Sequence, residues 1–370
     1  MFTSTRNEKI TQLLNEWYIE IRSRQINNAH RLKEQIDVQI ERLKEEEQES
    51  MQDQNLLLYY SLLDFRYNYL IDNLGVSKDS FNTIESFDVP TDNFLSYYYH
   101  FFKAIHYDAI GNHIIAKNHY YKAESLLQYI PDEVEKAEFY YKLGYAYYEN
   151  QQILQAIKEV TKAKDMFSNH SGYEANVAFC DNILGLACIK LREWSLAEEH
   201  LTSAMDRFQK IREEKFILMV RHNLGWMYSN QNLSNLALRY LSEVVEKSPN
   251  HYKAIFAKAL EHYKLKETDI TSELIEKGLE ICTDFKNEGY RHHFVILKAL
   301  NEKIVAEKLE TIILRGISYF KREELYDHIQ EYEEKLAIKF YEEDQHTKAS
   351  QYFYASSQSR QKSLDKGALK

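Results

Sequence analysis

Four polar residues, Gln52-Asp53-Gln54-Asn55, stand directly before the apolar block LLLYYSLL, where the core of a helix begins. Asp53 can cap such a helix, because its carboxylate accepts hydrogen bonds from the free N–H groups of the first turn. The amides of Gln52 and Gln54 are candidates for chemistry, since an amide both donates and accepts hydrogen bonds.

Another candidate amide is that of Asn223, which precedes Leu224-Gly225. An asparagine near the inner face of a helical repeat can hold a peptide backbone by donating to a C=O group and accepting from an N–H group. An ordinary surface asparagine is the alternative interpretation.

Other kinds of catalytic site are not indicated. The sequence has neither a Walker loop nor a G-x-S-x-G motif. His292 and His293 lack companions at metal-ligand spacing and are interpreted as surface residues. Cys180, Cys188 and Cys282 fit neither a disulfide framework nor a zinc site. We therefore expect no metal and no cofactor of the chain's own.

Helices must position these residues. The 370 residues include only 10 Gly and 3 Pro, and 14% are aromatic, which predicts an all-α fold. An apolar stripe at helical spacing marks the first of three amphipathic segments, with Ile10, Leu13, Leu14, Trp17 and Ile21. We expect a three-helix bundle over residues 1–74, its third helix running from about residue 53 to 73. A linker rich in Ser, Asp and Asn follows over residues 75–93.

An internal repeat of about 40 residues fills residues 94–370. Each unit has a large residue followed nine and then seven positions later by small ones, as in Tyr147, Ala156 and Ala163. Further sets begin at Tyr107, Cys188, Tyr228, Phe340 and, more weakly, at Tyr263 with Ser272 and Leu279. Leu-Gly before several of these positions is the tetratricopeptide signature. About six to seven repeats are predicted to form a right-handed superhelix whose concave face binds peptides.

Composition limits the partners and the compartment. A formal net charge of -10 argues against a nucleic-acid partner, which would require a basic surface. Arg22, Arg24 and Arg31 do not make a DNA-binding helix-turn-helix, because the second helix ends in a Glu-rich run. No stretch of 18 apolar residues or signal peptide is visible, and cysteines are few, so we expect no membrane partner and a cytoplasmic protein.

The chain resembles the Rap proteins of bacilli, the response regulator aspartate phosphatases. Four segments carry the resemblance in order, at residues 14–18 (LNEWY), 53–66 (DQNLLLYYSLLDFR), 94–103 (FLSYYYHFFK) and 121–141 (YKAESLLQYIPDEVEKAEFYY). The resemblance implies that the protein binds the phosphorylated receiver domain of a response regulator, often that of the sporulation phosphorelay. Gln54 would orient a water for attack on the aspartyl phosphate. Phe65, Leu95 and Asp53 would dock the receiver domain, which carries the Mg²⁺.

The resemblance also implies control by a short secreted Phr peptide. The peptide would bind inside the repeats, contract them and draw the bundle into the array. Asn223 matches the peptide-anchoring asparagine of the family, and the same site is expected to include Tyr147, Ala187, Lys190 and Phe256.

Several positions depart from the family pattern. Gln52 stands where relatives often have Glu, Ala187 where they have Asn, and Lys190 where they have Asp. A lysine would repel the basic peptide residue that the Asp typically faces. Either the chain reads a peptide with an acidic or neutral residue there, or it has lost peptide control. The linker also looks shorter than usual.

Three functional hypotheses follow. The first is a phosphatase of a response regulator, inhibited by a short peptide. The second is a non-catalytic Rap-type protein that sequesters a DNA-binding response regulator under peptide control. The third is a general tetratricopeptide adaptor, which leaves the match at the N-terminus unexplained.

Overall fold

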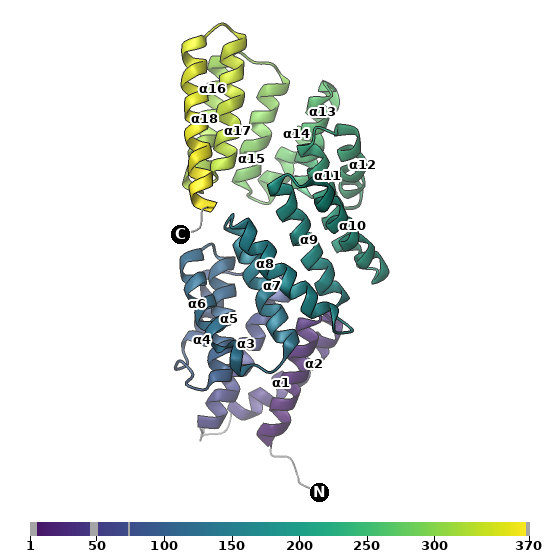
Figure 1. Ribbon diagram of the computed structural model, residues 1–370, viewed down its shortest axis with the longest axis vertical. Coiled ribbons are helices and arrows are strands. Elements are labelled where there is room, and N and C mark those ends of the chain that lie inside the picture. Colours follow the sequence, from purple (N-terminus) through teal and green to yellow (C-terminus); the bar gives the residue numbers. More distant parts are fainter. Residues whose placement is uncertain (1–5, 45–50, 73–74, 368–370) are drawn as a thin grey trace. The chain divides into compact units, whose positions relative to one another are not determined.

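The computed structural model describes residues 6–44, 51–72 and 75–367 (Figure 1), although the side chains of residues 44, 51–53 and 366–367 lie outside this description. Within these ranges every regular element is a helix, as the sequence predicts. The chain divides into two compact units. The first unit is Met1–Asn150 with Leu154–Leu184, and the second unit is Gln151–Ile153 with Gly185–Lys370.

Three helices form the N-terminal bundle: α1 (Arg6–Arg22), α2 (Ile26–Lys44) and α3 (Met51–Ile71). The predicted stripe of α1 faces inward, and Leu14 and Trp17 are fully buried. The linker that follows carries two short helices, η1 (Lys78–Phe81) and α4 (Asn82–Glu85). The predicted domain boundaries at residues 74 and 93 stay a prediction, since the first unit groups the bundle with the first repeats.

Residues 93–367 form seven successive helix pairs, each joined by a short turn. The pairs are α5 (Asn93–Ala109) and α6 (His113–Leu126), α7 (Glu133–Glu149) and α8 (Ile153–Ser168), α9 (Glu174–Leu191) and α10 (Trp194–Lys210), α11 (Glu214–Asn230) and α12 (Ser234–Lys247), α13 (Tyr252–Lys264) and α14 (Thr268–Asp284), α15 (Glu288–Asn301) and α16 (Ala306–Arg322), and α17 (Tyr326–Glu342) and α18 (His346–Gly367). A short 3₁₀ helix, η2 (Leu127–Tyr129), follows α6.

The Leu-Gly positions explain how the two helices of a pair approach. A Cβ on Gly144 would stand 2.5 Å from Val160 Cγ2, and a Cβ on Gly185 would stand 2.7 Å from Leu201 Cγ. Both distances are far below van der Waals contact, so only glycine allows this spacing. The second helices contribute small, buried residues to the same contacts, among them Ala156.

The weakest predicted repeat is one residue out of register with the structure. Ser272 is exposed and Leu279 is only half-buried, whereas Thr271 and Gly278 are buried. Gly278 is required there, because a Cβ would stand 2.1 Å from Phe294 Cζ. The small residues therefore still lie seven apart, but each lies one position earlier than the sequence pattern indicated.

Most described turns between the helices adopt the left-handed conformation at a residue other than glycine, whereas Gly111 and Gly172 do so with φ of 78° and 88°. At Arg192 φ is 61°, and the N–H of Glu193 donates to the carbonyl oxygen of Cys188 at 2.9 Å, which caps the C-terminus of α9. Among the described residues, positive φ outside glycine occurs at Arg24, Gln151, Arg192, Arg212, Asn232, Lys266, Lys286, Lys303, Glu324 and Asp344. Few glycines are needed because polar residues take their place.

Candidate functional site

Gln54 lies in the first turn of α3 and is exposed to solvent. The next residue, Asn55, is also exposed, and the buried face of the helix begins with Leu56. Gln52 and Asp53 belong to the same helix, but their side chains lie outside the part of the chain that the structure describes. The amide of Gln54 is thus available to a partner from a helix that is otherwise largely buried.

The helix that carries Gln54 is held from two sides. Leu57, Leu58 and Leu62 bury it in the core of the first unit. On one side the hydroxyl of Tyr59 donates to Asn15 Oδ1 of α1 at 3.0 Å. On the other side its ring packs against Tyr98 of α5, with centroids 5.8 Å apart. Because these contacts hold the helix in place, the amide of Gln54 is presented from a rigid element.

Phe65 and Leu95, the predicted docking residues, are buried in this structure, with 5% and 8% of their surface exposed. The ring of Phe65 packs edge-on against Phe81 of the linker, with centroids 5.2 Å apart. It also meets His106, whose Nε2 lies 3.0 Å from the carbonyl oxygen of Ser77. The linker therefore covers Phe65, and the docking role stays a prediction that requires the linker to move.

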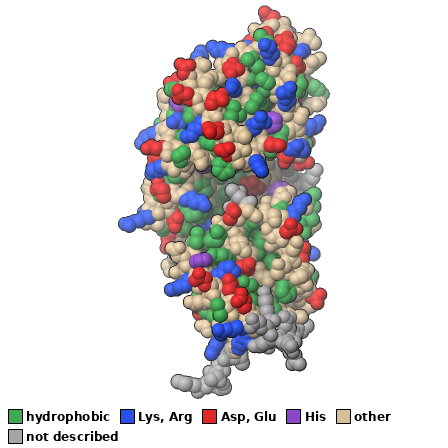
Figure 2. All heavy atoms as spheres, turned by 180° about the vertical axis from the view of Figure 1, so that it is seen from behind, with side chains coloured by type: hydrophobic (Ala, Val, Ile, Leu, Met, Phe, Trp, Pro, Cys, Tyr) green, Lys and Arg blue, Asp and Glu red, His purple; other side chains and the backbone are tan. Residues whose placement is uncertain are grey.

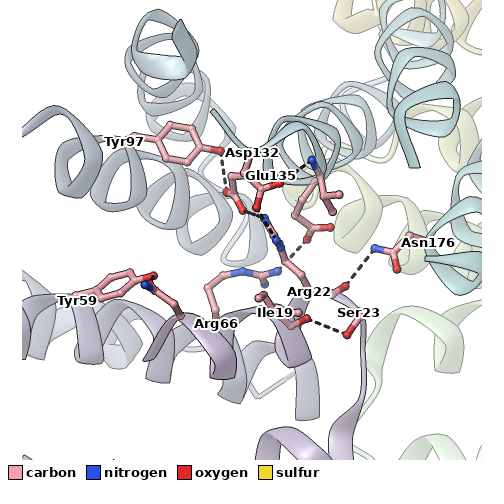
Figure 3. Close-up of polar contacts among 12 residues, drawn as sticks. Ile19, Arg22, Ser23, Tyr59, Arg66, Tyr97, Asp132, Glu135 and Asn176 are labelled. Carbon is pink, nitrogen blue, oxygen red and sulfur yellow. Dashed lines mark hydrogen bonds and ion pairs between the residues drawn. The ribbon is translucent and has the colours of Figure 1, made fainter. Parts of the chain in front are cut away.

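A buried charge network joins the bundle to α7 (Figure 3). Arg22 of α1 places Nη1 3.0 Å from Glu135 Oε2 and Nη2 2.8 Å from Asp132 Oδ2. Tyr97 donates to the other oxygen of Glu135 at 2.9 Å. Asn176 of α9 donates to the backbone oxygen of Arg22 at 3.3 Å. The end of α1 is thereby fixed against two repeats of the first unit.

A second buried pair runs parallel to the first. Arg66 of α3 places Nη2 2.9 Å from Glu138 Oε1, and both side chains are at most 4% exposed. Glu135 and Glu138 lie three residues apart and hence on one face of α7. Burial raises the pKa of Glu135, and the nearby Arg22 opposes that rise. The bundle and α7 thus meet through two buried ion pairs, Arg22 with Glu135 and Arg66 with Glu138, while Asp132 contacts Arg22 from a partly exposed position.

Sequence reasoning missed this network. The sequence pointed to Arg22 only as a possible DNA contact, and to Arg66 only as part of a family segment. The available signal was the pair Glu135 and Glu138 on a helix face flanked by Val134, Ala137 and Phe139. Buried carboxylates require cations, and a search for arginines on other helices would have followed.

Asn223 is nearly buried in α11 of the second unit, with 9% of its surface exposed. The Nδ1 atom of the neighbouring His222 lies 3.4 Å from its Oδ1 atom. Burial lowers the pKa of His222 to about 4, and His251, whose ring centroid is 5.1 Å away, adds to this. The histidine is therefore neutral at pH 7. The Asn223 amide therefore has a neutral imidazole, half-buried beside it, as one of its neighbours.

The other predicted peptide residues lie in different surroundings. Phe256 is half-buried against Tyr290 and Phe294. Ala187 is fully buried, so its methyl group does not reach the surface in this conformation. Tyr147 is half-buried and belongs to the first unit, where it packs on the core. Their roles in peptide binding stay predictions.

Lys190 of α9 is paired within the second unit. Its Nζ lies 3.5 Å from Asp327 Oδ2 of α17, and the two side chains are 29% and 51% exposed. Ser363 of α18 donates to the other oxygen of Asp327. The position at which the chain departs from the family pattern is thus engaged by the chain's own carboxylate.

Among the described residues no group of three His, Cys, Asp or Glu side chains is placed to hold a metal ion. Of the described helices, none combines the length and apolar character that crossing a membrane requires. On the face drawn in Figure 2, acidic and basic side chains are intermixed, without a broad basic area.

Comparison with known proteins gives matches along almost the whole chain. Residues 4–72 match a protein family described as "response regulator aspartate phosphatase H, N terminal". Response regulator aspartate phosphatase H of Bacillus subtilis (strain 168) is 26% identical, covering 96% of this chain and 95% of that protein. Regulatory protein RapF of the same strain is 25% identical, covering 96% and 95%.

Solved structures share the fold. A Rap protein complexed with competence and sporulation factor superposes with a TM-score of 0.83 at 23% identity, covering 97% of this chain and 99% of that chain. The Rap conjugation gene regulator of plasmid pLS20, in complex with the Phr* peptide, gives 0.65 at 20% identity, covering 98% of each. Residues 4–72 thus match the N-terminal family of a response regulator aspartate phosphatase, and the chain is similar to Rap proteins in sequence and in fold over almost its whole length.

Proposed function

We propose that the protein is a response regulator aspartate phosphatase that hydrolyses the aspartyl phosphate of a receiver domain, in the sporulation phosphorelay. The observation that carries the proposal is the exposed amide of Gln54 on a buried, firmly held helix. This amide lies within residues 4–72, which match the N-terminal family of a response regulator aspartate phosphatase.

The chemistry requires little more than positioning. An aspartyl phosphate is an acyl phosphate, whose carboxylate is already a good leaving group, so placing a water in line with the P–O bond is the main task. Gln54 Oε1 accepts a hydrogen bond from that water, and Nε2 donates to a phosphoryl oxygen. Water oxygen bonds to phosphorus as the P–O bond to the Asp breaks, releasing inorganic phosphate and a carboxylate, with the excess proton passing to solvent. The Mg²⁺ belongs to the receiver domain.

A neutral amide suits this position better than a carboxylate, since a carboxylate would be repelled by the phosphoryl oxygens. Gln54→Ala and Gln54→Glu are therefore the test variants. The control is Gln12→Ala, which removes an exposed amide from α1 that hydrogen-bonds only locally to Glu16. Each is mixed with a ³²P-labelled receiver domain, and loss of label and binding are both measured.

Both Gln54 variants should lose at least about a hundredfold in hydrolysis, the lower end of the effect of removing one polar group that stabilises a transition state. Binding of the receiver domain and the Gln12→Ala rate should stay near wild type. Hydrolysis that survives Gln54→Ala would rule out this mechanism.

The second candidate, sequestration of a DNA-binding regulator, is favoured by one observation. A relative as similar as the phosphatase, at 25% against 26% identity, is named a regulatory protein. This candidate predicts no loss of label from any receiver domain. It also predicts that the protein prevents a response regulator from shifting its DNA in a gel.

We further propose that a short linear peptide binds the repeats and inhibits this activity, with Asn223 holding the peptide backbone. A Rap protein in complex with the Phr* peptide shares the fold and supports this proposal. Asn223→Ala should weaken binding of such a peptide. An unchanged affinity would remove Asn223 from the site.

A further inference from the structure

Two histidine side chains meet between the helices of the first pair. The Nδ1 atom of His100 in α5 lies 3.0 Å from the Nδ1 atom of His119 in α6. The ring centroids are 5.1 Å apart, and both side chains are half-buried, so solvent can reach them. A hydrogen bond explains this contact if one of the two nitrogens carries a proton. The same two atoms are also a pair of donors of the kind that metal ions take from histidines.

The distance between the two nitrogen atoms suits one kind of metal geometry. With metal–nitrogen bonds of about 2.05 Å, nitrogens 3.0 Å apart subtend an angle of about 94° at the metal. Tetrahedral coordination requires about 109° and nitrogens about 3.3 Å apart. An angle near a right angle is that of neighbouring ligands in a square-planar or tetragonal site, which Cu²⁺ and Ni²⁺ prefer.

Aromatic neighbours hold both imidazole rings in place. Tyr107 of α5 stacks on His119, with ring centroids 6.0 Å apart and an angle of 11° between the ring planes. Tyr99 packs edge-on against His100, with centroids 5.3 Å apart. Rings that are packed in this way keep their orientation, so the two nitrogens are held in position before any ion binds.

The charges around the two rings are compatible with a bound cation. Lys103 lies one turn after His100, but its Nζ is 2.8 Å from Glu85 Oε1 of the linker. Lys122 is exposed, so water and salt screen its charge. Burial lowers the pKa of each ring to about 4, and these lysines contribute in the same direction. Both rings are therefore neutral at pH 7, the form in which histidine binds metals.

A histidine pair of the second unit shows that contact between rings is not enough. The rings of His222 and His251 also have centroids 5.1 Å apart. However, His251 Nδ1 accepts from the N–H of Ala254 at 3.1 Å, and His222 Nδ1 lies 3.4 Å from Asn223 Oδ1. Those nitrogens are engaged at the start of α13 and by an amide, whereas the Nδ1 atoms of the first pair face each other.

We propose that His100 and His119 form a binding site for one divalent transition-metal ion, Cu²⁺ or Ni²⁺, with water at its remaining positions. The ion replaces the hydrogen bond between the rings with two metal–nitrogen bonds, and so cross-links α5 to α6. The sequence does not indicate this site, because two histidines 19 positions apart match no metal motif. Mg²⁺ prefers oxygen ligands and is not expected to bind here.

The probe is the metal salt alone, added to the metal-free full chain. Calorimetric titration gives the affinity and stoichiometry, and the electron paramagnetic resonance spectrum of bound Cu²⁺ reports how many nitrogens coordinate it. The test variants are His100→Gln and His119→Gln. The matched control is His346→Gln, which removes an exposed histidine that contacts Asp344 and Tyr341 rather than a second histidine.

Wild type should bind Cu²⁺ through two nitrogens, and more tightly than it binds Ni²⁺ or Zn²⁺. Each test variant should weaken Cu²⁺ binding by at least about tenfold, since losing even an outer-shell partner of a metal ligand costs about 10–100-fold. His346→Gln should bind as wild type does. Saturation with Ni²⁺ should slow hydrogen exchange in α5 and α6 of wild type but not of the test variants.

Two results would overturn the inference: a wild-type spectrum without two nitrogen ligands, or equal Cu²⁺ affinities for wild type and both test variants. The two histidines would then form only a hydrogen bond. The spectrum is measured on wild type, so the inference can be refuted even if a variant does not fold. Neither result bears on the proposed function, because the site uses neither Gln54 nor Asn223.

Discussion

Replacing Arg22 with methionine tests whether the buried charge network holds the bundle against the repeats. The methionine keeps much of the apolar stem but removes the guanidinium from Glu135, which is fully buried. Glu135 still accepts a hydrogen bond from the hydroxyl of Tyr97, but this hydroxyl is neutral and does not replace the charge of the guanidinium. Removing one partner of a buried ion pair costs about 3–5 kcal/mol, and the full burial of Glu135 places this variant in that range.

The effect should depend on pH in a defined direction. Burial already raises the pKa of Glu135, and losing Arg22 removes the group that opposes this rise. The folded variant then holds a proton that the unfolded chain releases, so its stability falls as pH rises above the unfolded value of 4.5. The loss should therefore be smaller at pH 5 than at pH 8.

The double variant Arg22→Met with Glu135→Leu should recover most of the loss, since an apolar pair can replace a buried ion pair. Urea unfolding is followed by tryptophan fluorescence, to which the fully buried Trp17 contributes together with Trp194 and Trp226. Hydrogen exchange reports the opening of α1 and α7 separately. The control is Arg322→Met, whose partners are exposed and which should leave the urea midpoint unchanged. A midpoint for Arg22→Met that matches this control, or a double variant no better than the single one, would refute the reasoning.

Two further predictions concern packing and a buried lysine. Gly144→Ala should lower the free energy of unfolding by about 1–3 kcal/mol, and by more than Gly185→Ala does. The reason is that the new methyl group at position 144 meets the stiff side chain of Val160 and its backbone nitrogen. Equal urea midpoints for the two variants would contradict this. Burial lowers the pKa of Lys142 to about 7, so between pH 7 and 9 only the unfolded chain keeps that proton. Between pH 7 and 9 the free energy of unfolding of wild type should therefore rise by up to about 1.4 kcal/mol per pH unit. Lys142→Met should lack this rise, which urea midpoints measured across the same pH range would show.

The helix pairs could be read from the sequence because their determinants are local. Gly144 and Ala156 mark close contacts at fixed spacing, and such spacing survives in a single sequence. The register near Thr271 could not be read, because Thr and Gly replace Ala there and because the deciding contact, with Phe294, comes from the next pair.

The surroundings of the candidate site were harder to foresee. Helical spacing places Phe65 on the same face as Gln54, but Phe65 is covered by Phe81 and Gln54 is not. Which residue is covered depends on the path of the linker, and that path is set by tertiary contacts. The partner of Lys190 was equally out of reach, since no local pattern points to Asp327.

The turns with positive φ also affect the unfolded chain. A left-handed residue other than glycine costs about 1–2 kcal/mol in the native backbone. Glycine would avoid that cost. It would also raise the conformational entropy of the unfolded chain, which lowers the stability of the folded protein by about 0.4–1 kcal/mol. Six of the ten residues are Lys or Arg, which interact favourably with a helix C-terminus by about 0.3–1 kcal/mol.

These contributions nearly cancel, so the choice of residue in a turn is close to neutral for folding. Mutations can then accumulate in the turns while the hydrogen bonds that cap the helices persist. Sequence drift of this kind is compatible with a fold shared across 97% of the chain at 23% identity. It also means that repeats in such chains are better located by the small residues buried between their helices than by glycine or proline in the turns.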